Sequence, residues 1–484
     1  MKNLENITAE RVFKHFEEIN KIPRGSGNEK EISDYLLAFG KKLGLESIQD
    51  KALNIIIKKP ASKGYENAPT VIIQGHMDMV CEKNKETSHD FTKDPIKLIV
   101  KDDFIYADGT TLGGDDGIAV AYAMAILEDS TIDHPALEVL ITTDEEAGMT
   151  GAIALEPENI TGKIVLNIDS EEEGKLLVSC AGGIRTKSTL PIEWIKEKKD
   201  TINYEVMVKG LKGGHSGAEI HLGRGNSNKI IGRVLRELSK EVNFNLVSLN
   251  GGSKNNAIPR EAEALISVKS EDENKLIDII KKLESDIKKE FSVKDPGLAI
   301  EARKVEEKFE KVFSDESTVK TINLLYIYPN GINTVSSEID GLTESSTNVG
   351  VVITNENDIE FDSAVRSSVF SLREEIVERI KCVTELFGGT VTANAGYPEW
   401  EYKEDSKVRE ICKDVYKKMY GKDAEIVAIH AGVECGLFKE KLGDLDMISF
   451  GPDIFDAHTP NEHMSIPSVK RVWEYLLEVL KVIK

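Results

Sequence analysis

Histidine and acidic residues in this chain follow apolar segments, where they could bind metal ions. His76 and Asp78 come directly after the apolar run TVIIQG. Alternate side chains of an extended segment share a face, so these two side chains point the same way. This pairing suits a metal-bound imidazole whose second N–H is held by a carboxylate. Taken alone, His-x-Asp is more often a polar strand end, so the interpretation depends on the other acidic segments.

Three further acidic segments occupy similar places. GGDDG contains Asp115 and Asp116 between glycines that allow a tight turn, although an N-cap aspartate in a turn is an alternative. TTDEEAG places Glu145 and Glu146 at the end of an apolar run, and adjacent carboxylates there need cations nearby or solvent. KIVLNI leads into Asp169 in the same way.

His458 lies in the segment SFGPDIFDAHTPNEHMSI. An apolar run precedes it, and glycine and proline frame its loop, which is how a rigid scaffold presents functional groups. A surface histidine is the alternative for this residue taken alone. The segments together are explained more simply by one metal centre, with the ligands His76, Asp115, Glu146, Asp169 and His458.

This ligand set has two imidazoles and three carboxylates but no thiolate. Such a set suits zinc, with manganese or cobalt as substitutes. One carboxylate shared by two ions about 3.5–4 Å apart leaves room for a bridging water, as in two-metal hydrolases. The positive charge of two divalent ions exceeds the negative charge of three carboxylates. The remaining positive charge favours a bound hydroxide over a bound water. On an extended backbone Glu145 points away from its neighbouring ligand, so we predict that it is the general base.

The elements that must position these residues alternate between strands and helices. LNIIIKK, TVIIQG, ALEVLITTD and KIVLNID are typical of buried strands, and GIAVAYAMAILED is typical of a helix. The alternation predicts an α/β fold, with a largely parallel mixed sheet flanked by helices. Functional groups of such sheets collect beyond the carboxyl ends of the strands, where the candidate ligands lie.

The pattern changes after SCAGGI, at residues 179–184, to alternating strands and charged helices, which is typical of an α+β domain. After about residue 390 it returns to the α/β type. We therefore predict a discontinuous catalytic domain over residues 1–185 and 390–484, with an inserted α+β lid domain over residues 186–389. The insert is long enough to hold two related halves.

Length and charge exclude several classes of protein. The chain has 484 residues, with 62 Lys and Arg against 84 Asp and Glu, a net charge of −22. This charge repels phosphate backbones and anionic lipids, so we expect neither nucleic acid nor a membrane as partner. No apolar run reaches the ~18 residues that span a bilayer, and a cytoplasmic location is expected. The five cysteines are far apart and never in CxxC spacing, which argues against disulfides and thiolate zinc sites.

In their order along the chain, the motifs resemble those of the di-zinc metallopeptidases related to carnosinase, aminoacylase and glutamate carboxypeptidases. The shared motifs are GHMDMV, GGDDGIA, TTDEEAG, NIDSEE, GGHSG, NAIPREAEA and GPDIFDAHTPNE. The long insert, with RSSVFSL, NAGYPEW and HAGVECGLF, is similar to the aminoacyl-histidine dipeptidase (peptidase D) branch. The resemblance covers nearly the whole chain, and its motifs are specific in combination.

The resemblance implies one ligand pair for each metal ion and one bridging carboxylate: His76 with Asp169, Glu146 with His458, and Asp115 between the ions. Asp78 would orient His76. Glu145 would be the base that later gives its proton to the leaving amine. Asp116 as ligand in place of Asp115 remains an alternative.

The resemblance also implies residues that contact the substrate. His215 of GGHSG matches a position that contacts the developing oxyanion. Asn256 and Arg366 match positions that contact the substrate carbonyl and carboxylate. A glycine-rich turn, an ordinary turn and a surface arginine are the respective alternatives. HAGVECGLF stands where shorter members have a substrate loop rich in Gly, Thr and Ser, so His430 and Glu434 are candidates for substrate binding.

The implied function is a cytosolic metallo-dipeptidase with two Zn²⁺ per chain, Co²⁺ or Mn²⁺ being possible substitutes. It would split Xaa-Xaa dipeptides, above all Xaa-His of the β-alanyl-histidine type, by attack of a hydroxide that bridges the two ions. A di-metal aminopeptidase or an N-acyl amino-acid deacylase on the same fold is the alternative. A non-catalytic binding protein is disfavoured because the base and all five ligands occur together. The expected partner is a small dipeptide, and the chain is a monomer or a homodimer.

Overall fold

The computed structural model describes residues 9–484, which form two compact units. Unit 1 comprises residues 9–179, Tyr402–Ala428 and Val433–Lys484, and unit 2 comprises Cys180–Glu401 and Ile429–Gly432. Among residues 9–484, no helix combines the length and the apolar character needed to cross a membrane.

The main sheet of unit 1 carries the candidate ligands. Its strands are β1 (Glu46–Gln49), β2 (Ile55–Lys59), β3 (Val71–His76), β6 (Leu137–Thr142), β7 (Ile164–Asn167), β8 (Lys175–Cys180), β22 (Glu425–Ile429) and β23 (Asp446–Ser449). Within the described residues their spatial order is β1-β2-β6-β3-β7-β23-β8-β22. The central strands β6, β3, β7 and β23 are parallel, while β1, β2 and β8 run antiparallel to their neighbours. The predicted mixed, largely parallel sheet is therefore confirmed.

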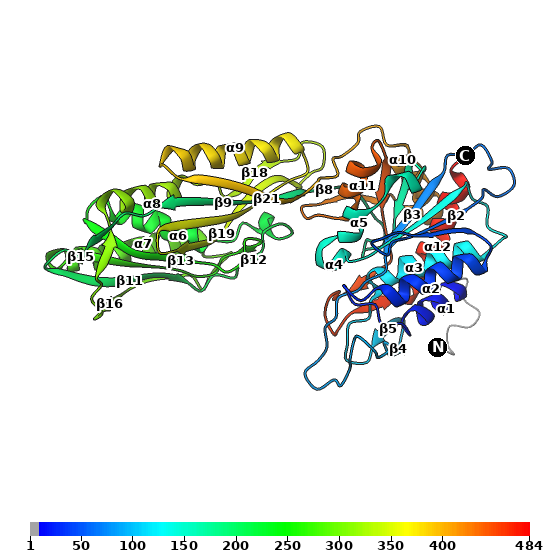
Figure 1. The fold of residues 1–484 in the computed structure, drawn as a ribbon, viewed down its shortest axis with the longest axis horizontal. Helices are drawn as coiled ribbons and strands as arrows, with labels where there is room; N and C mark the ends of the chain where they lie inside the picture. Colours follow the sequence, from blue (N-terminus) through cyan, green and yellow to red (C-terminus); the bar gives the residue numbers. More distant parts are fainter. Residues whose placement is uncertain (1–8) are drawn as a thin grey trace. The chain divides into compact units, whose positions relative to one another are not determined.

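Helices flank this sheet (Figure 1). They are α1 (Glu10–Ile19), α2 (Lys30–Lys42), α3 (Gly114–Glu128), α4 (Glu145–Gly148), α5 (Thr150–Ala154), α10 (Lys407–Tyr420), α11 (Glu434–Leu442) and α12 (Ile466–Val482). The side chains of α3 are buried all round from Asp116 to Leu127, because α3 packs between α1 and β3. A smaller sheet contains β4 (Leu98–Lys101), β5 (Phe104–Ala107), β24 (Ile454–Phe455) and β25 (His463–Ser465).

Unit 2 is built on an antiparallel sheet. Its long strands are β9 (Gly182–Pro191), β11 (Thr201–Lys209), β13 (Phe244–Gly251), β15 (Ala262–Lys269), β16 (Ala299–Val305), β18 (Gly331–Val335), β19 (Thr343–Thr354), β20 (Asp358–Ser367) and β21 (Thr390–Tyr397). Short strands are β10 (Trp194–Lys196), β12 (Gly214–His215), β14 (Ala257–Ile258) and β17 (Lys311–Phe313). Its helices are α6 (Ser227–Leu238), α7 (Glu273–Phe291), α8 (Asp315–Ile327) and α9 (Phe370–Leu386).

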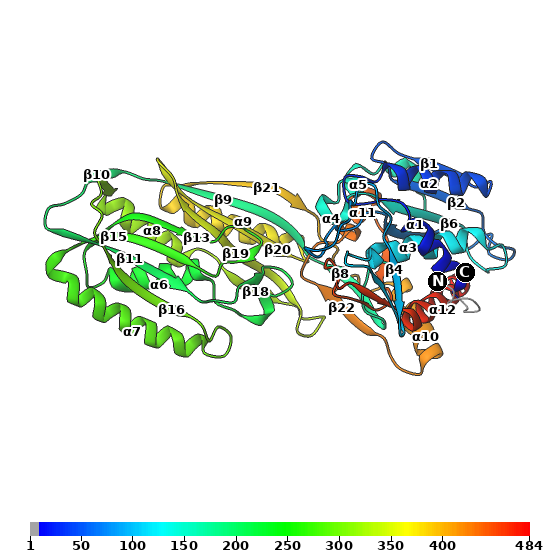
Figure 2. The ribbon, with the colours of Figure 1, turned by 90° about the horizontal axis from the view of Figure 1, so that it is seen from below.

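The sheet of unit 2 contains two halves of the same topology. One half runs β11-α6-β13-β15-α7-β16 and the other β9-α8-β19-β20-α9-β21, each a strand-helix-strand-strand-helix-strand unit. The strands of each half take the same spatial order, and β13 joins β19 at the junction. The helices cover one face of the sheet (Figures 1 and 2). Because α6 packs on α8, the two halves share one hydrophobic core.

Candidate metal centre

Parallel strands bring the predicted ligands of unit 1 together. His76 pairs with Thr142 of β6, and Gln74 of β3 pairs with Asn167 of β7, so the three strands end at one edge of the sheet. The segments that follow these ends therefore meet beyond the carboxyl edge. They carry the acidic residues Asp78, Glu145, Glu146 and Asp169.

Asp115 lies between the two histidines. Its Oδ1 is 3.2 Å from Nε2 of His76, and its Oδ2 is 3.0 Å from Nε2 of His458. Each histidine also faces a second carboxylate: Nε2 of His76 is 3.5 Å from Oδ1 of Asp169, and Nε2 of His458 is 2.8 Å from Oε1 of Glu146. The structure thus brings all five predicted ligands into one cluster, with Asp115 at its middle.

The neighbouring Asp116 has a different environment. Its side chain is buried, and its Oδ2 accepts the backbone N–H of His76 at 3.2 Å. Asp116 nevertheless has a carboxylate oxygen within 4.8 Å of ligand atoms of His76 and Asp169, while a second such group contains Asp115, Glu146 and His458. Asp116 therefore binds the end of β3, whereas the two oxygens of Asp115 face different histidines.

Asp78 connects His76 to the start of α4. Its Oδ1 lies 3.3 Å from Nδ1 of His76 and accepts the backbone N–H of Glu145 at 3.1 Å. Its Oδ2 accepts the backbone N–H of Glu146 at 3.3 Å and the hydroxyl of Ser26 at 2.8 Å. One carboxylate thus orients an imidazole and holds the segment that carries two glutamates.

The expectation that Glu145 lies on an extended backbone is wrong. Glu145 is the first residue of the short helix α4, which follows Asp144 in the left-handed conformation at φ 55°. Consecutive side chains of a helix leave its axis about 100° apart. Even so, a carboxylate oxygen of Glu145 and one of Glu146 lie within 4.8 Å of each other and of a ring nitrogen of His76. The role of Glu145 as the base therefore stays a prediction.

Two buried charged residues hold the loop that leads to Asp115, and sequence reasoning did not find them. The carboxylate of Glu462 accepts the backbone N–H groups of Leu112, Gly113 and Gly114 at 2.8, 3.1 and 2.7 Å. The guanidinium of Arg24 donates to the backbone carbonyl of Gly113 at 2.6 Å.

Arg24 also donates to the carbonyls of Met77 and Asp78, at 3.1 and 3.2 Å, so it links this loop to the segment after β3. Gly113 is left-handed at φ 67°, and a Cβ there would lie 2.4 Å from Nη2 of Arg24. The only signal in the sequence for Glu462 is its place in HTPNE, close to His458, and Arg24 has none.

The electrostatics of the cluster show an excess of buried carboxylates. Burial raises the pKa of Glu145 to about 9 and also raises the pKa of Glu146 and of Asp169. Hydrogen bonds to Asp115 and Glu146 raise the pKa of His458 to about 11. Without other cations, such a cluster must retain protons. The donor set of imidazoles and carboxylates therefore fits divalent metal ions, which replace those protons.

Glu434, the first residue of α11, is also buried in unit 1. Its Oε2 accepts hydrogen bonds from Nε2 of Gln74 and Oγ1 of Thr142, both at 2.7 Å. Burial raises the pKa of Glu434 to about 8. Its contacts are thus with β3 and β6, the strands that carry His76 and the start of the Glu145 segment.

The other predicted substrate residues belong to unit 2. His215 pairs with Ala257 between β12 and β14, so the exposed Asn256 directly precedes the strand partner of His215. Nδ1 of His215 accepts the backbone N–H groups of Gly217 and Ala218, at 3.3 and 3.0 Å. Burial and the nearby Arg366 lower the pKa of His215. The neutral ring therefore carries its proton on Nε2, which is free to donate.

Arg366 of β20 lies close to two histidines of unit 2, His215 and His430. A Cβ at Gly217 would lie 3.1 Å from Nε of Arg366, 3.1 Å from Cε1 of His215 and 2.4 Å from the carbonyl oxygen of His430. Burial lowers the pKa of His430 to about 3, and its Nε2 lies 2.7 Å from Oγ of Ser346. His215, Arg366 and His430 thus form a second cluster.

The guanidinium of Arg366 has no anionic partner among the residues that the structure describes. The side chain is 8% exposed and donates to the hydroxyl of Tyr397, but no acidic side chain within residues 9–484 forms an ion pair with it. A buried charge is ordinarily paired, so this guanidinium suits an anionic ligand.

Comparisons with known proteins show to which family the chain belongs. Residues 72–482 match the family described as "Peptidase family M20/M25/M40". The chain is 38% identical over 484 residues to the cytosol non-specific dipeptidase of Escherichia coli (strain K12), which covers 100% of this chain and 99% of that protein.

Solved structures show the same relationship. The aminoacylhistidine dipeptidase from Vibrio alginolyticus superposes with a TM-score of 0.94 at 38% identity, covering 99% of this chain and 98% of that one. Aminopeptidase PepT from Bacillus cereus superposes with a TM-score of 0.55 at 17% identity over 98% of both chains, which shows the shared fold alone. The resemblance inferred from the motifs is confirmed, and the chain belongs to peptidase family M20/M25/M40.

Proposed function

We propose that this chain is a cytosolic dipeptidase that works with two divalent metal ions. Full-length similarity to a protein named cytosol non-specific dipeptidase and to a protein named aminoacylhistidine dipeptidase supports this function. The observation that carries the proposal is the position of Asp115, whose two carboxylate oxygens each face a different histidine.

The residues that would hold the ions follow from these contacts. His76 and Asp169 would hold one ion, Glu146 and His458 the other, and Asp115 would contact both. We assign zinc to both positions, with Co²⁺ or Mn²⁺ as substitutes, because the donors are imidazoles and carboxylates. Bound divalent ions supply Lewis acidity and make a nucleophile available near neutral pH.

The chain's own groups provide the proton transfers and the orientation of the site. Glu145 accepts the proton of the attacking water and returns it to the leaving amine, a role assigned to it because it begins α4 directly beside the assigned ligand Glu146. Asp78 keeps His76 and the backbone of Glu145 in place through its hydrogen bonds.

Residues of unit 2 are proposed to recognise the substrate. The Nε2–H of His215 donates to the carbonyl oxygen as negative charge develops there, and the unpaired guanidinium of Arg366 binds the substrate carboxylate. Asn256 is assigned to the substrate carbonyl because it precedes the strand partner of His215. We assign His430 and Glu434 to the support of these two clusters, because Ser346 and the strand residues Gln74 and Thr142 are their partners.

A panel of substrates tests this proposal. The metal-loaded protein should cleave unmodified dipeptides, β-alanyl-histidine among them, because Arg366 is assigned to the free carboxylate that they carry. N-acetylation and C-terminal amidation should each reduce kcat/KM at least about tenfold, the loss of one charged hydrogen bond. Undiminished cleavage of the amides would indicate an aminopeptidase, and hydrolysis of N-acyl amino acids a deacylase.

A further inference from the structure

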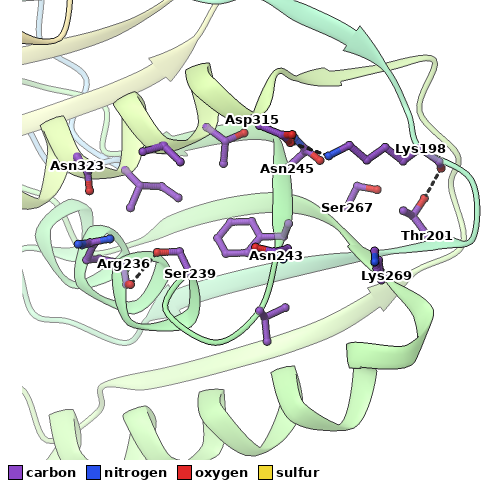
Figure 3. A pocket seen from close by; sticks show the side chains of 15 residues that line it. Lys198, Thr201, Arg236, Ser239, Asn243, Asn245, Ser267, Lys269, Asp315 and Asn323 are labelled. Carbon is purple, nitrogen blue, oxygen red and sulfur yellow. Dashed lines mark hydrogen bonds and ion pairs between the residues drawn. The ribbon is translucent and has the colours of Figure 1, made fainter.

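A polar pocket lies wholly within unit 2 and contains none of the residues assigned to catalysis (Figure 3). Its volume is about 380 Å³. Side chains of α6, α8 and the ends of β11, β13 and β15 line it. This volume falls within the range of small-molecule sites, about 300–1,000 Å³. The pocket can therefore hold a molecule of metabolite size.

The charge of the pocket has the opposite sign to that of the chain. Its charged lining residues are Lys198, Arg236, Lys269 and Asp315, in a chain with a net charge of −22. Lys198 forms an ion pair with Asp315 at 2.6 Å. Arg236 and Lys269 are therefore two positive side chains without an acidic partner in the lining. Lys269 has only a 3.5 Å contact with Glu271. The lining as a whole thus favours an anion.

Arg236 is the strongest feature of the pocket. Within residues 9–484, no side chain or carbonyl forms a hydrogen bond or an ion pair with its guanidinium. By contrast, Arg233, one turn earlier on α6, makes a two-pronged ion pair with Glu290 at 2.6 and 2.8 Å. A guanidinium without a partner offers a fork of N–H donors that matches a carboxylate or a phosphoryl group.

The other residues that line the pocket include side-chain amides that are available for hydrogen bonds, and apolar side chains. The side-chain amides of Asn243 and Asn323 have no hydrogen-bond partner within the part of the chain that the structure describes. In contrast, Asn245 is already paired, because its amide donates to Asp315 at 2.7 Å. Phe244 and Ile322 supply apolar surface. The ligand therefore needs an apolar part as well as anionic groups.

Figure 3 shows how the charges are distributed. In this view, Arg236 and Asn323 lie at one end of the pocket, and Lys198, Thr201 and Lys269 lie at the other end. We propose that the pocket binds a small organic anion whose anionic groups, carboxylate or phosphoryl, reach toward Arg236 and Lys269. Because α6 belongs to one half of unit 2 and α8 to the other, the bound anion would contact both halves.

Calorimetric titration of the full-length, metal-loaded protein tests this site, with glutarate and inorganic phosphate as separate probes. At least one probe should bind, and Arg236→Ala should weaken its binding about tenfold or more, the effect of losing a charged hydrogen bond. Lys269→Ala should weaken binding in the same direction. Arg233→Ala is the matched control, because it removes the same charge from the same helix but leaves the pocket lining intact.

Each outcome decides for or against the pocket. Arg236-dependent binding of glutarate identifies a carboxylate ligand, and Arg236-dependent binding of phosphate identifies a phosphoryl ligand. Binding that is equal in Arg236→Ala and Arg233→Ala proteins resides elsewhere, the metal centre included, and overturns the proposal. The absence of binding by both probes overturns it as well. Dipeptide cleavage in the Arg236→Ala protein should equal that of the unmodified protein, so this test is independent of the proposed function.

Discussion

Asp78 illustrates how single residues combine tasks in the metal centre. Its carboxylate contacts Nδ1 of His76 and accepts backbone N–H groups of Glu145 and Glu146. His76, Asp78 and Glu146 are predictable from the sequence because each lies at or just beyond the end of an apolar strand. Arg24 and Glu462 are not, since burial of a charged side chain depends on tertiary partners that no local pattern reveals.

The first prediction concerns the base. Glu145→Gln keeps the shape of the side chain but cannot accept a proton, so kcat should fall at least about 10²-fold. Metal content should not change, because Glu145 is not assigned as a ligand. Steady-state kinetics and elemental analysis of the same sample check both statements. Near-normal turnover would show that another residue is the general base, and Asp144 would be the next residue to test.

The second prediction concerns pH and stability of the metal-free protein. Burial raises the pKa of Glu434 to about 8, above its value in the unfolded chain. Between these two pKa values the folded state binds more protons than the unfolded state, so this group makes stability fall as pH rises toward 8. Glu434→Gln removes this titration and retains an oxygen that accepts from Gln74 and Thr142.

Thermal unfolding in chelator at about pH 5.5 and about pH 9 measures this effect. The Tm of the Glu434→Gln protein should fall less between the two values than that of the unmodified protein. The exposed Glu440→Gln serves as control and should behave as the unmodified protein does. Equal losses of Tm in all three proteins would contradict the argument.

At the scale of elements, apolar periodicity predicts most of what positions the site. The predicted strand TVIIQG corresponds to β3, and the predicted helix GIAVAYAMAILED lies within α3 except for its last residue, Asp129. The prediction fails at Glu145, where the short helix α4 replaces an extended segment. That helix has a left-handed residue at each end, and the carboxylate of Asp78 accepts the backbone N–H groups of Glu145 and Glu146. The contact with Asp78 is a tertiary feature that a local sequence pattern does not reveal.

The third prediction concerns the loop before α3. Glu462 accepts three consecutive backbone N–H groups of the loop that leads to Asp115, so it is a positioning residue. Glu462→Gln should lower metal affinity or kcat about 10–100-fold, the usual cost of losing an outer partner of a metal ligand. KM should change little, and Glu440→Gln should change neither quantity.

A variant with normal kcat and normal metal affinity but a reduced Tm would show that Glu462 only stabilises the fold. Metal titration and kinetics together therefore separate the two roles.

At the scale of the whole molecule, unit 2 interrupts the chain of unit 1 and has its own core. The change of sequence texture near residue 180 predicts an inserted α+β segment, and the role of residues 186–389 as a lid stays a prediction. The two halves have the same order of elements, but this order is not visible as a repeat in the sequence. Different apolar side chains can fill the core of the same arrangement of strands and helices.

The fourth prediction concerns the origin of His215. His215 lies within the inserted residues 186–389, and we predict that each chain supplies its own His215 to its own metal centre. His215→Ala should lower kcat about 10²–10³-fold, the effect of losing one oxyanion donor, with unchanged metal content. A mixture of His215→Ala and Glu145→Gln chains should then remain inactive. Recovery of activity on mixing would show that the histidine is donated between subunits.

The most direct test of the central claim follows activity while zinc is returned to chelator-treated protein. Dipeptide hydrolysis should rise with added zinc and reach its maximum at two equivalents per chain, because Asp115 lies between two separate pairs of ligands. Asp115→Ala should abolish this response at the same protein concentration. Full activity at one equivalent of zinc, or full activity in chelator, would contradict the two-metal account.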